Sequence, residues 1–211
     1  MQMQNVSIGA LVPFIIAMAI VVVVSNILVQ HPFGYFGLEE LLTWGAFTYP
    51  VAFLVNDLTN RRFGTKAARK VVAAGFLIAV ILSIYFATPR IAIASGSAFL
   101  VAQMLDVRIF DRLRGDAWWK APFISSLIGA VVDTILFFGI AFAPAFAGID
   151  ALFGMEDGSL GFPAGIFGIA MPLWASLAIG DFLVKVLVGV VALVPYAGVL
   201  KSMGYQLKSA G

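Results

Sequence analysis

Acidic and amide side chains interrupt the long apolar stretches of this sequence. The segment SAFLVAQMLDVRIF, residues 97–110, holds Gln103 and Asp106 one helical turn apart among residues that suit a hydrocarbon environment. A charged side chain at the centre of a membrane costs about 2.5–3.5 kcal/mol on insertion scales, so such residues are expected to face the protein interior and to carry function. The polar residues placed in this way are Asn26, Gln30, Asp57, Gln103, Asp106, Asp133, Asp181 and Lys185.

These groups suit the recognition of a flat, polar heterocycle. A carboxylate can accept two hydrogen bonds from adjacent N–H groups of a guanine-like edge, and a side-chain amide can donate to a ring carbonyl. Trp44, Phe47 and Trp174 lie on the same stretches and supply rings that can stack on the face of the heterocycle. Composition alone does not favour such a compound over another small solute.

Enzymatic chemistry has little support in the sequence. The chain has one histidine, His31, and no cysteine, which excludes thiolate chemistry and makes a histidine metal site or a Ser-His triad improbable. No Gly-x-Ser-x-Gly, His-Glu-x-x-His or P-loop motif occurs. We therefore expect a protein that is not an enzyme, with no metal and no cofactor.

Asp133 and Lys185 are expected to form a pair. Asp133 lies 11 residues past Pro122, and Lys185 lies 12 residues past Leu173 in a later stretch. At a rise of about 1.5 Å per residue, each is about 17–18 Å deep, near the middle of a membrane. Asp181 precedes Lys185 by four residues, the favourable order for an ion pair on one helix face.

Structural roles are the alternatives for the same residues. Asp57 could cap its helix or pair with Arg61, and Asp106 could pair with a nearby arginine. Asp133 and Lys185 could form a purely structural pair, although buried pairs often contribute little net stability. Hydrogen bonding between helices would explain the amides Asn26 and Gln30, and a position in the aromatic belt would explain Trp44.

Composition assigns the chain to the integral membrane proteins. Of its 211 residues, 62% are hydrophobic and 11% are charged, and the mean hydropathy is +1.02. A soluble domain is about half apolar and about a quarter charged. A span needs about 20 apolar residues, which predicts a single all-α domain over residues 1–211 with six transmembrane helices. The expected spans are Ile8–Val29, Leu41–Leu58, Val71–Ala87, Ile91–Phe110, Pro122–Pro144 and Leu173–Val199, the last preceded by an interfacial piece that ends near Pro172.

The basic residues predict the orientation. Nearly all of the 13 lysines and arginines lie in TNRRFGTKAARK, in VRIFDRLRGDAWWK or in the C-terminal tail, which six alternating spans place on one side. The other side holds Glu39, Glu40, Asp150, Glu156 and Asp157, with Arg90. Because positive loops stay in the cytoplasm, both termini are expected there. A solvated basic loop explains these charges better than nucleic-acid binding does.

Several long motifs resemble a known family, the queuosine precursor transporters, also called the vitamin-uptake-transporter-like family. They are SNILVQ from Ser25, TWGAFTYPVAFLVNDLTNRRFG from Thr43, RIAIAS from Arg90, QMLDVRIFDRLR from Gln103, WWKAP from Trp118, VDTILFFGIAF from Val132 and DFLVKVLVGVVALVPYAGVL from Asp181. The resemblance covers all spans and places the family's characteristic acids and lysine at Asp57, Asp106, Asp133, Asp181 and Lys185. One departure is the outer segment 147–172, which is longer here than in close relatives.

The resemblance implies a six-helix bundle similar to the substrate-binding subunits of energy-coupling-factor vitamin importers. It also implies import of 7-cyano-7-deazaguanine or 7-aminomethyl-7-deazaguanine across a bacterial inner membrane for queuosine salvage, with the lipid bilayer and the small molecule as partners. A homo-oligomer is compatible with the sequence. Two other functions stay open: a vitamin-type binding subunit that works with an ATPase module, and an intramembrane enzyme.

Overall fold

Long helices make up most of the computed structural model, which describes residues 6–29, 31–36, 38, 42–166 and 169–207. Gln30, Glu39 and Glu40 therefore lie outside the described residues. The elements in order are α1 (Ile8–Leu28), α2 (Gly45–Thr48), α3 (Val51–Phe63), α4 (Thr65–Phe86), α5 (Pro89–Leu113), α6 (Lys120–Phe142), a 3-10 turn (Pro144–Phe146), α7 (Gly148–Leu152), β1 (Pro163–Ile166), β2 (Ile169–Pro172) and α8 (Leu173–Ser202).

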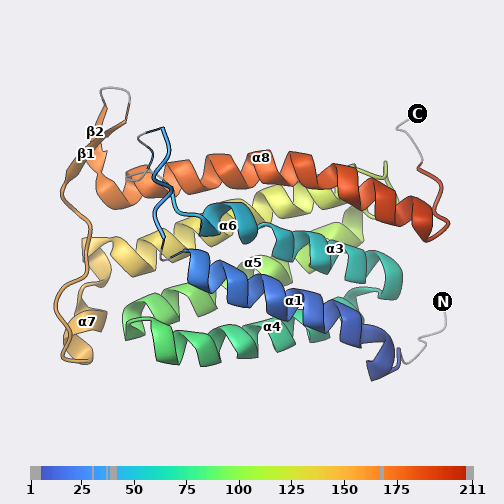
Figure 1. Cartoon of the computed structure of the whole chain (residues 1–211), viewed down its shortest axis with the longest axis horizontal. Helices are drawn as coiled ribbons and strands as arrows, with labels where there is room; N and C mark the ends of the chain where they lie inside the picture. The colour runs from blue at the N-terminus through green and yellow to red at the C-terminus, as the bar shows by residue number, and fades with distance from the viewer. Residues whose placement is uncertain (1–5, 30, 37, 39–41, 167–168, 208–211) are drawn as a thin grey trace.

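The helices form one elongated bundle (Figure 1). The start of α1, the α3–α4 connection and the end of α8 lie at one end of the bundle, and α7 and the β1–β2 hairpin lie at the other. Helix α5 packs against α4 and α6, and α6 also packs against α8. Large apolar side chains such as Ile81, Ile135 and Leu187 remain exposed on the outside, as expected for helices that face lipid.

Five of the predicted spans are confirmed as helices. Among the described residues, α1, α4, α5, α6 and α8 are each long and apolar enough to cross a membrane. The predicted start of the last span at Leu173 coincides with the start of α8. Helix α4 begins at Thr65, six residues before the predicted Val71, because the basic segment itself is helical.

The predicted second span over Leu41–Leu58 is wrong as a continuous helix. The structure has α2 and α3 instead, joined by Tyr49 and Pro50. Proline lacks the N–H that would continue the α-helical ladder, and its ring clashes with the preceding turn. Helix α3 then continues to Phe63, past the predicted end at Leu58.

A single glycine connects α3 to α4. Gly64 has a φ of +83° and is both the end of one helix and the start of the next. Glycine adopts this conformation without the steric cost that a Cβ atom would bring. Arg61 and Arg62 therefore lie in the last turn of α3, and the expected basic loop is a tight turn between two helices.

The outer segment carries a short β-element, and the fold is otherwise all-α as predicted. The interfacial piece expected before Leu173 contains an antiparallel hairpin, in which Pro163 is opposite Pro172 and Ile166 is opposite Ile169. The hairpin is short and lies beyond the end of the bundle (Figure 1). The protein is thus a helical membrane protein with a small β-element in one connection.

Glycine also allows two helices to approach closely in the bundle interior. A Cβ atom on Gly129 in α6 would lie 2.6 Å from Cε1 of Phe53 in α3. Gly139, on the same helix, has nothing within 4 Å of such an atom. The packing of α3 on α6 therefore depends on the absence of a side chain at Gly129.

We expect Gly129→Ala to lower the melting temperature of the detergent-purified protein. The added methyl group must displace the Phe53 ring, and overpacking of this kind costs about 1–3 kcal/mol. Gly139→Ala is the matched control and should leave the melting temperature unchanged or slightly raised, because alanine is the better helix former. Equal melting temperatures for the two variants would contradict the tight α3–α6 contact.

Candidate functional site

A buried ion cluster joins α6 to α8. The Lys185 ammonium donates to Oδ2 of Asp133 at 2.6 Å and to Oγ1 of Thr134 at 3.3 Å. It also pairs with Asp181, one turn earlier on α8. The side chains of Lys185 and Asp133 are each 5% exposed. The predicted approach of Asp133 and Lys185 is therefore confirmed, and so is the pairing of Asp181 with Lys185.

Two residues of this cluster were missed by the sequence analysis. The Tyr49 hydroxyl donates to Oδ1 of Asp133 at 3.1 Å, and the Lys185 ammonium lies 5.4 Å from the Tyr49 ring centroid. The Thr134 hydroxyl donates to Asp181 at 3.0 Å. Only the position of Tyr49 next to a proline in an apolar stretch could have indicated its role, since tyrosine is common in membrane helices.

The cluster lines a cavity of about 430 Å³ toward the end of the bundle that carries α7 and the hairpin. Ligand cavities in proteins commonly enclose about 300–1,000 Å³, so a bicyclic heterocycle fits. Its wall is formed by Ser25, Asn26, Val29, Leu42, Thr43, Gly45, Ala46, Tyr49, Phe86, Ala87, Thr88, Ile91, Ser95, Ala98, Asp133, Phe137, Phe138, Phe142, Leu177, Asp181 and Lys185. We call this space the outer cavity. It combines the charged groups of the cluster with phenylalanine rings.

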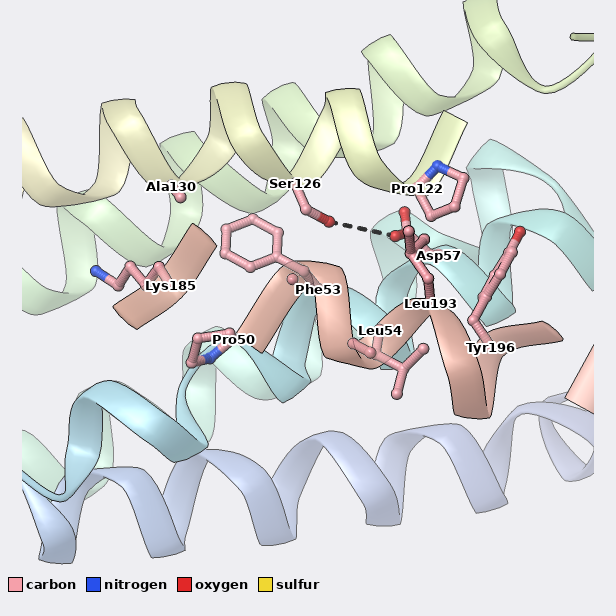
Figure 2. Close-up of a pocket in the computed structure, with 12 residues that line it drawn as sticks. Pro50, Phe53, Leu54, Asp57, Pro122, Ser126, Ala130, Lys185, Leu193 and Tyr196 are labelled. Atoms are coloured by element: carbon pink, nitrogen blue, oxygen red, sulfur yellow. Dashed lines mark hydrogen bonds between the residues drawn. The ribbon is translucent and has the colours of Figure 1, made fainter. Parts of the chain in front are cut away.

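A much smaller crevice of about 20 Å³ continues from Lys185 toward the other end of the bundle. Figure 2 shows Asp57 and Phe53 from α3 facing Ser126 from α6, with Lys185 beyond the Phe53 ring. Lys185 lines both spaces. The ion cluster therefore separates the outer cavity from this inner crevice.

A second cluster of polar side chains is buried between α3, α5 and α6. Asn56, Asp57, Gln103 and Asp106 are each at most 2% exposed. Asn56 Nδ2 donates to Oδ2 of Asp106 at 2.8 Å and to the backbone carbonyl of Gln103 at 3.3 Å. Among the described residues, no partner reaches either side-chain heteroatom of Gln103 or Oδ1 of Asp106. Neither Gln103 nor Asp106 lines the outer cavity.

The alternative ion pairs for these acids are not formed. Among the ion pairs of the described chain, none joins Asp57 or Asp106 to an arginine. The Arg61 guanidinium donates instead to the Tyr196 hydroxyl at 3.0 Å and to the Arg114 carbonyl at 2.6 Å. Asn56, which the sequence analysis also missed, precedes Asp57 and lies four residues before Asn60, a spacing that could have indicated a polar helix face.

The other predicted site residues are dispersed. Asn26 lines the outer cavity and donates to the Val22 carbonyl at 2.9 Å. Trp44 and Phe47 contact the Phe33 ring, with centroids 4.8 and 5.2 Å away, and Trp44 is 38% exposed. Trp174 lies at the start of α8 and lines neither space in the described part of the chain. Gln30 lies outside the described residues.

The sequence matches a family model described as "Putative vitamin uptake transporter" over residues 43–88 and 83–199. The chain is 34% identical over 205 residues to a queuosine precursor transporter of Escherichia coli, with 87% of this chain and 83% of that protein covered. The chain belongs to this transporter family. Its members are named as transporters, so the family is one of carriers and not of enzymes.

Two further relatives of this transporter are named probable queuosine precursor transporters. The one from Haemophilus influenzae is 33% identical over 179 residues, with 75% of this chain and 68% of the relative covered. The one from Bacillus subtilis is 26% identical over 209 residues, with 86% and 80% covered. No solved structure matches the chain.

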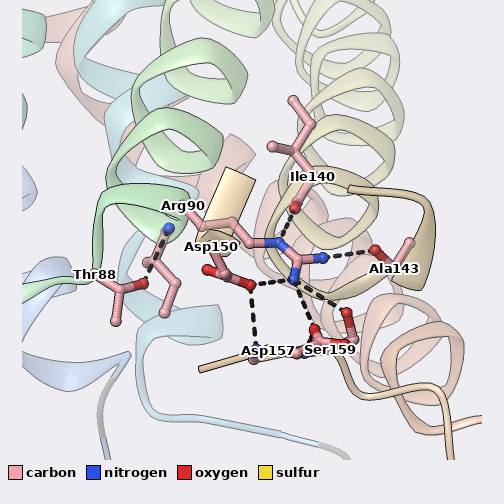
Figure 3. Close-up of polar contacts among 9 residues, drawn as sticks. Thr88, Arg90, Ile140, Ala143, Asp150, Asp157 and Ser159 are labelled. Carbon is pink, nitrogen blue, oxygen red and sulfur yellow. Dashed lines mark hydrogen bonds and ion pairs between the residues drawn. The ribbon is translucent and has the colours of Figure 1, made fainter. Parts of the chain in front are cut away.

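Arg90 fastens the outer segment of the transporter to the bundle (Figure 3). It lies in the first turn of α5 and is 1% exposed. Its guanidinium donates to Asp150 at 2.6 Å and to the carbonyls of Ile140 and Ala143 at 2.8 and 2.6 Å. The isolation of Arg90 among the acids of this side of the sequence is a signal that could have indicated its role.

The same guanidinium holds the loop that follows α7. It donates to the Ser159 hydroxyl at 3.1 Å and lies 3.5 Å from Asp157. Hydrogen bonds from the side chain and backbone of Ser159, together with Arg90, hold the pKa of Asp157 below its ordinary value. An exposed aspartate is already charged at neutral pH, so the lowered pKa of Asp157 keeps its contact with Arg90 charged at more acidic pH as well.

We expect Lys185→Ala to destabilise the transporter strongly. Removal of the ammonium leaves Asp133 and Asp181 buried without their cation, and loss of one partner of a buried pair costs about 3–5 kcal/mol. Lys201→Ala, on an exposed position near the end of the same helix, is the matched control. The readout is the melting temperature of purified protein together with its yield from membranes. A Lys185→Ala protein as stable as the control would show that the cluster contributes nothing to folding.

Proposed function

We propose that this chain imports queuosine precursors, 7-cyano-7-deazaguanine or 7-aminomethyl-7-deazaguanine, for queuosine salvage. The observation that carries the proposal is the 34% identity, over most of both chains, to a relative named for that activity. The outer cavity supports it, because its volume and its mixture of rings, hydroxyls and carboxylates suit a purine-like solute. No cofactor enters the proposal.

Asp133, Asp181, Lys185 and Asn26 are the residues we assign to substrate binding in the outer cavity. A carboxylate can accept from the ring N–H edge, and Asn26 or Lys185 can donate to the ring carbonyl. Phe137, Phe138 and Phe142 are the rings in the cavity wall that can stack on the heterocycle. They take the place we expected for Trp44, Phe47 and Trp174, which would contact the solute at the entrance.

The charge of the cluster favours the aminomethyl precursor. Two carboxylates face one ammonium, so a negative charge remains for a cationic substrate to neutralise. The cyano precursor carries no such charge and would depend on ring hydrogen bonds. We assign Asp57, Gln103 and Asp106 to the inner part of the path, through which the solute leaves.

We further propose six membrane passes, with α2 and α3 together forming the second. Helix α3 has only 13 residues, too few to span about 30 Å alone, and α2 supplies the remaining length. Broken helices at a substrate site are common in transporters, because irregular backbone is tolerated where it lines a cavity. This arrangement would be similar to that of the substrate-binding subunits of energy-coupling-factor importers, as the sequence motifs imply.

The orientation we propose places the start of α1 and the end of α8 at the cytoplasmic face of the bacterial inner membrane. Arg61, Arg62 and Lys66 at the α3–α4 turn, and Arg112 and Arg114 after α5, support it through the positive-inside rule. These basic residues then flank the membrane and have no role with nucleic acid. The apolar outer faces of the helices are available to lipid and to a second copy of the chain.

The direct test is uptake of labelled 7-cyano-7-deazaguanine by cells that cannot synthesise it. Expression of this chain should restore uptake and queuosine in transfer RNA. Reconstitution of the pure protein into liposomes separates the two transport mechanisms. Uptake by the chain alone would exclude an obligatory ATPase module, whereas binding without uptake would indicate a vitamin-type binding subunit.

Substitution of Asp181 should weaken binding of the cationic precursor. Asp181→Asn removes a negative charge from the outer cavity, so the affinity for 7-aminomethyl-7-deazaguanine should fall about tenfold or more, the equivalent of about 1.4 kcal/mol. The cyano precursor should lose less. Asp111→Asn, at an exposed carboxylate near the end of α5, is the control. Calorimetry on purified protein measures both affinities. Equal losses of affinity for the two precursors would show that the charge of Asp181 does not contribute to recognition of the cationic one.

Cysteine labelling tests the orientation without interference, because the chain has no native cysteine. Arg69→Cys, exposed in α4, should react with a membrane-impermeant maleimide only after the membrane is opened. Met155→Cys, 45% exposed in the outer segment, should react in intact spheroplasts. The reverse pattern would invert the proposed orientation.

A further inference from the structure

The carboxyl groups of Asp57 and Asp106 lie next to each other in the bundle interior. Asn56, the residue before Asp57, donates to Oδ2 of Asp106 at 2.8 Å, and the two carboxyl groups interact directly. Asp57 accepts from Ser125 and Ser126 at 3.4 Å each. Asp106 accepts from Asn56 through Oδ2, while its buried Oδ1 has no donor among the described residues. One oxygen of the pair therefore lacks the hydrogen that burial requires.

Repulsion between the two carboxylates explains how this oxygen can be given a hydrogen. Two carboxylates that share a buried site repel each other, so one of them keeps a proton. A proton on Asp57 can be donated to the vacant oxygen of Asp106, which satisfies both groups. The pair then carries one proton and a single negative charge.

Within the described part of the chain, no lysine or arginine forms an ion pair with Asp57 or Asp106. On α3, Arg61 donates to the Tyr196 hydroxyl of α8 and to a backbone carbonyl. Helix α6 offers Ser125 and Ser126, and the buried residues of α4 are all uncharged. Lys185 lines the same crevice as Asp57, but its ammonium is bound by Asp133 and Asp181.

The position of the pair suits a proton that crosses with the substrate. Asp57 lies seven residues before Gly64, about 10 Å from that end of the bundle at the usual helical rise. On its other side, the inner crevice leads to Lys185 and the outer cavity. The pair therefore lies between the substrate site and the proposed cytoplasmic face.

We propose that Asp57 and Asp106 form the proton-binding site that couples uptake to an inward proton gradient, an inference that rests on the proposed import function. A second proton from the outer side forms one O–H bond and makes the pair neutral. Loss of that proton to the cytoplasm breaks the bond and restores the single negative charge. Because a buried charge is costly, the neutral pair lowers the barrier to rearrangement of α3 against α5.

Proteoliposomes with an imposed pH difference test this site. The probe is labelled 7-cyano-7-deazaguanine, which is neutral and does not itself titrate with the gradient. If one proton enters with each molecule, a difference of one pH unit supports about tenfold accumulation. The wild-type protein should reach this accumulation, and a protonophore should abolish it. Accumulation that persists without a proton gradient, or that follows sodium instead, would overturn the proposal.

Variants of the pair separate coupling from binding. Asp57→Asn and Asp106→Asn should abolish accumulation above equilibrium, while substrate binding in the outer cavity, which neither residue lines, persists in calorimetry. Asp111→Asn, on α5 but exposed, should accumulate like wild type. Normal accumulation by both pair variants would refute the site. Absence of both binding and exchange in the wild-type protein would refute the import function itself, which is a different result.

Infrared spectroscopy keeps the proposal testable if a variant fails to fold. The wild-type protein at neutral pH should show a protonated carboxyl stretch that shifts in D₂O. Absence of this band would show that the pair holds no proton and would overturn the proposal without any variant.

Discussion

The attraction between one buried ammonium and two buried carboxylates determines how the rest of this bundle is arranged. Lys185 and Asp181 come from α8, and Asp133 comes from α6, so the cluster fixes the depth of one helix against the other. An isolated charge in this environment would be costly, and only the three groups together are tolerated. Both the outer cavity and the inner crevice are bounded by this cluster, because Lys185 lines the two of them.

The broken α2–α3 segment contributes a side chain to the same cluster. Tyr49, directly before Pro50 at the helix break, donates to Asp133, and the lysine ammonium lies over its ring. The helix break and the ion cluster are therefore parts of one site, although Tyr49 and Asp133 are 84 residues apart in the sequence.

Apolar runs were sufficient to predict the five long helices, because a helix that crosses the membrane needs about 20 consecutive apolar residues. The pairing of Asp133 with Lys185 was also predictable, since equal depth and opposite sign suffice. The helix break at Pro50 was not, because the apolar run over Leu41–Leu58 continues through it. Phe137, Phe138 and Phe142 could not be distinguished from lipid-facing residues, since that distinction depends on the rotation of α6 about its axis. Likewise, the adjacency of Asp57 and Asp106 depends on how α3 crosses α5, which no spacing within one helix specifies.

The Gly64 turn has a mechanical consequence. With a single residue between α3 and α4, there is no slack at that end, so the two helices cannot slide independently there. Helix α4 is also packed against α1 and α5, which hold it in place. Any displacement of α3 must then be absorbed at its opposite end, at Tyr49 and Pro50. The most compliant joint of this part of the bundle is thereby located beside the ion cluster, where a bound solute can act on it directly.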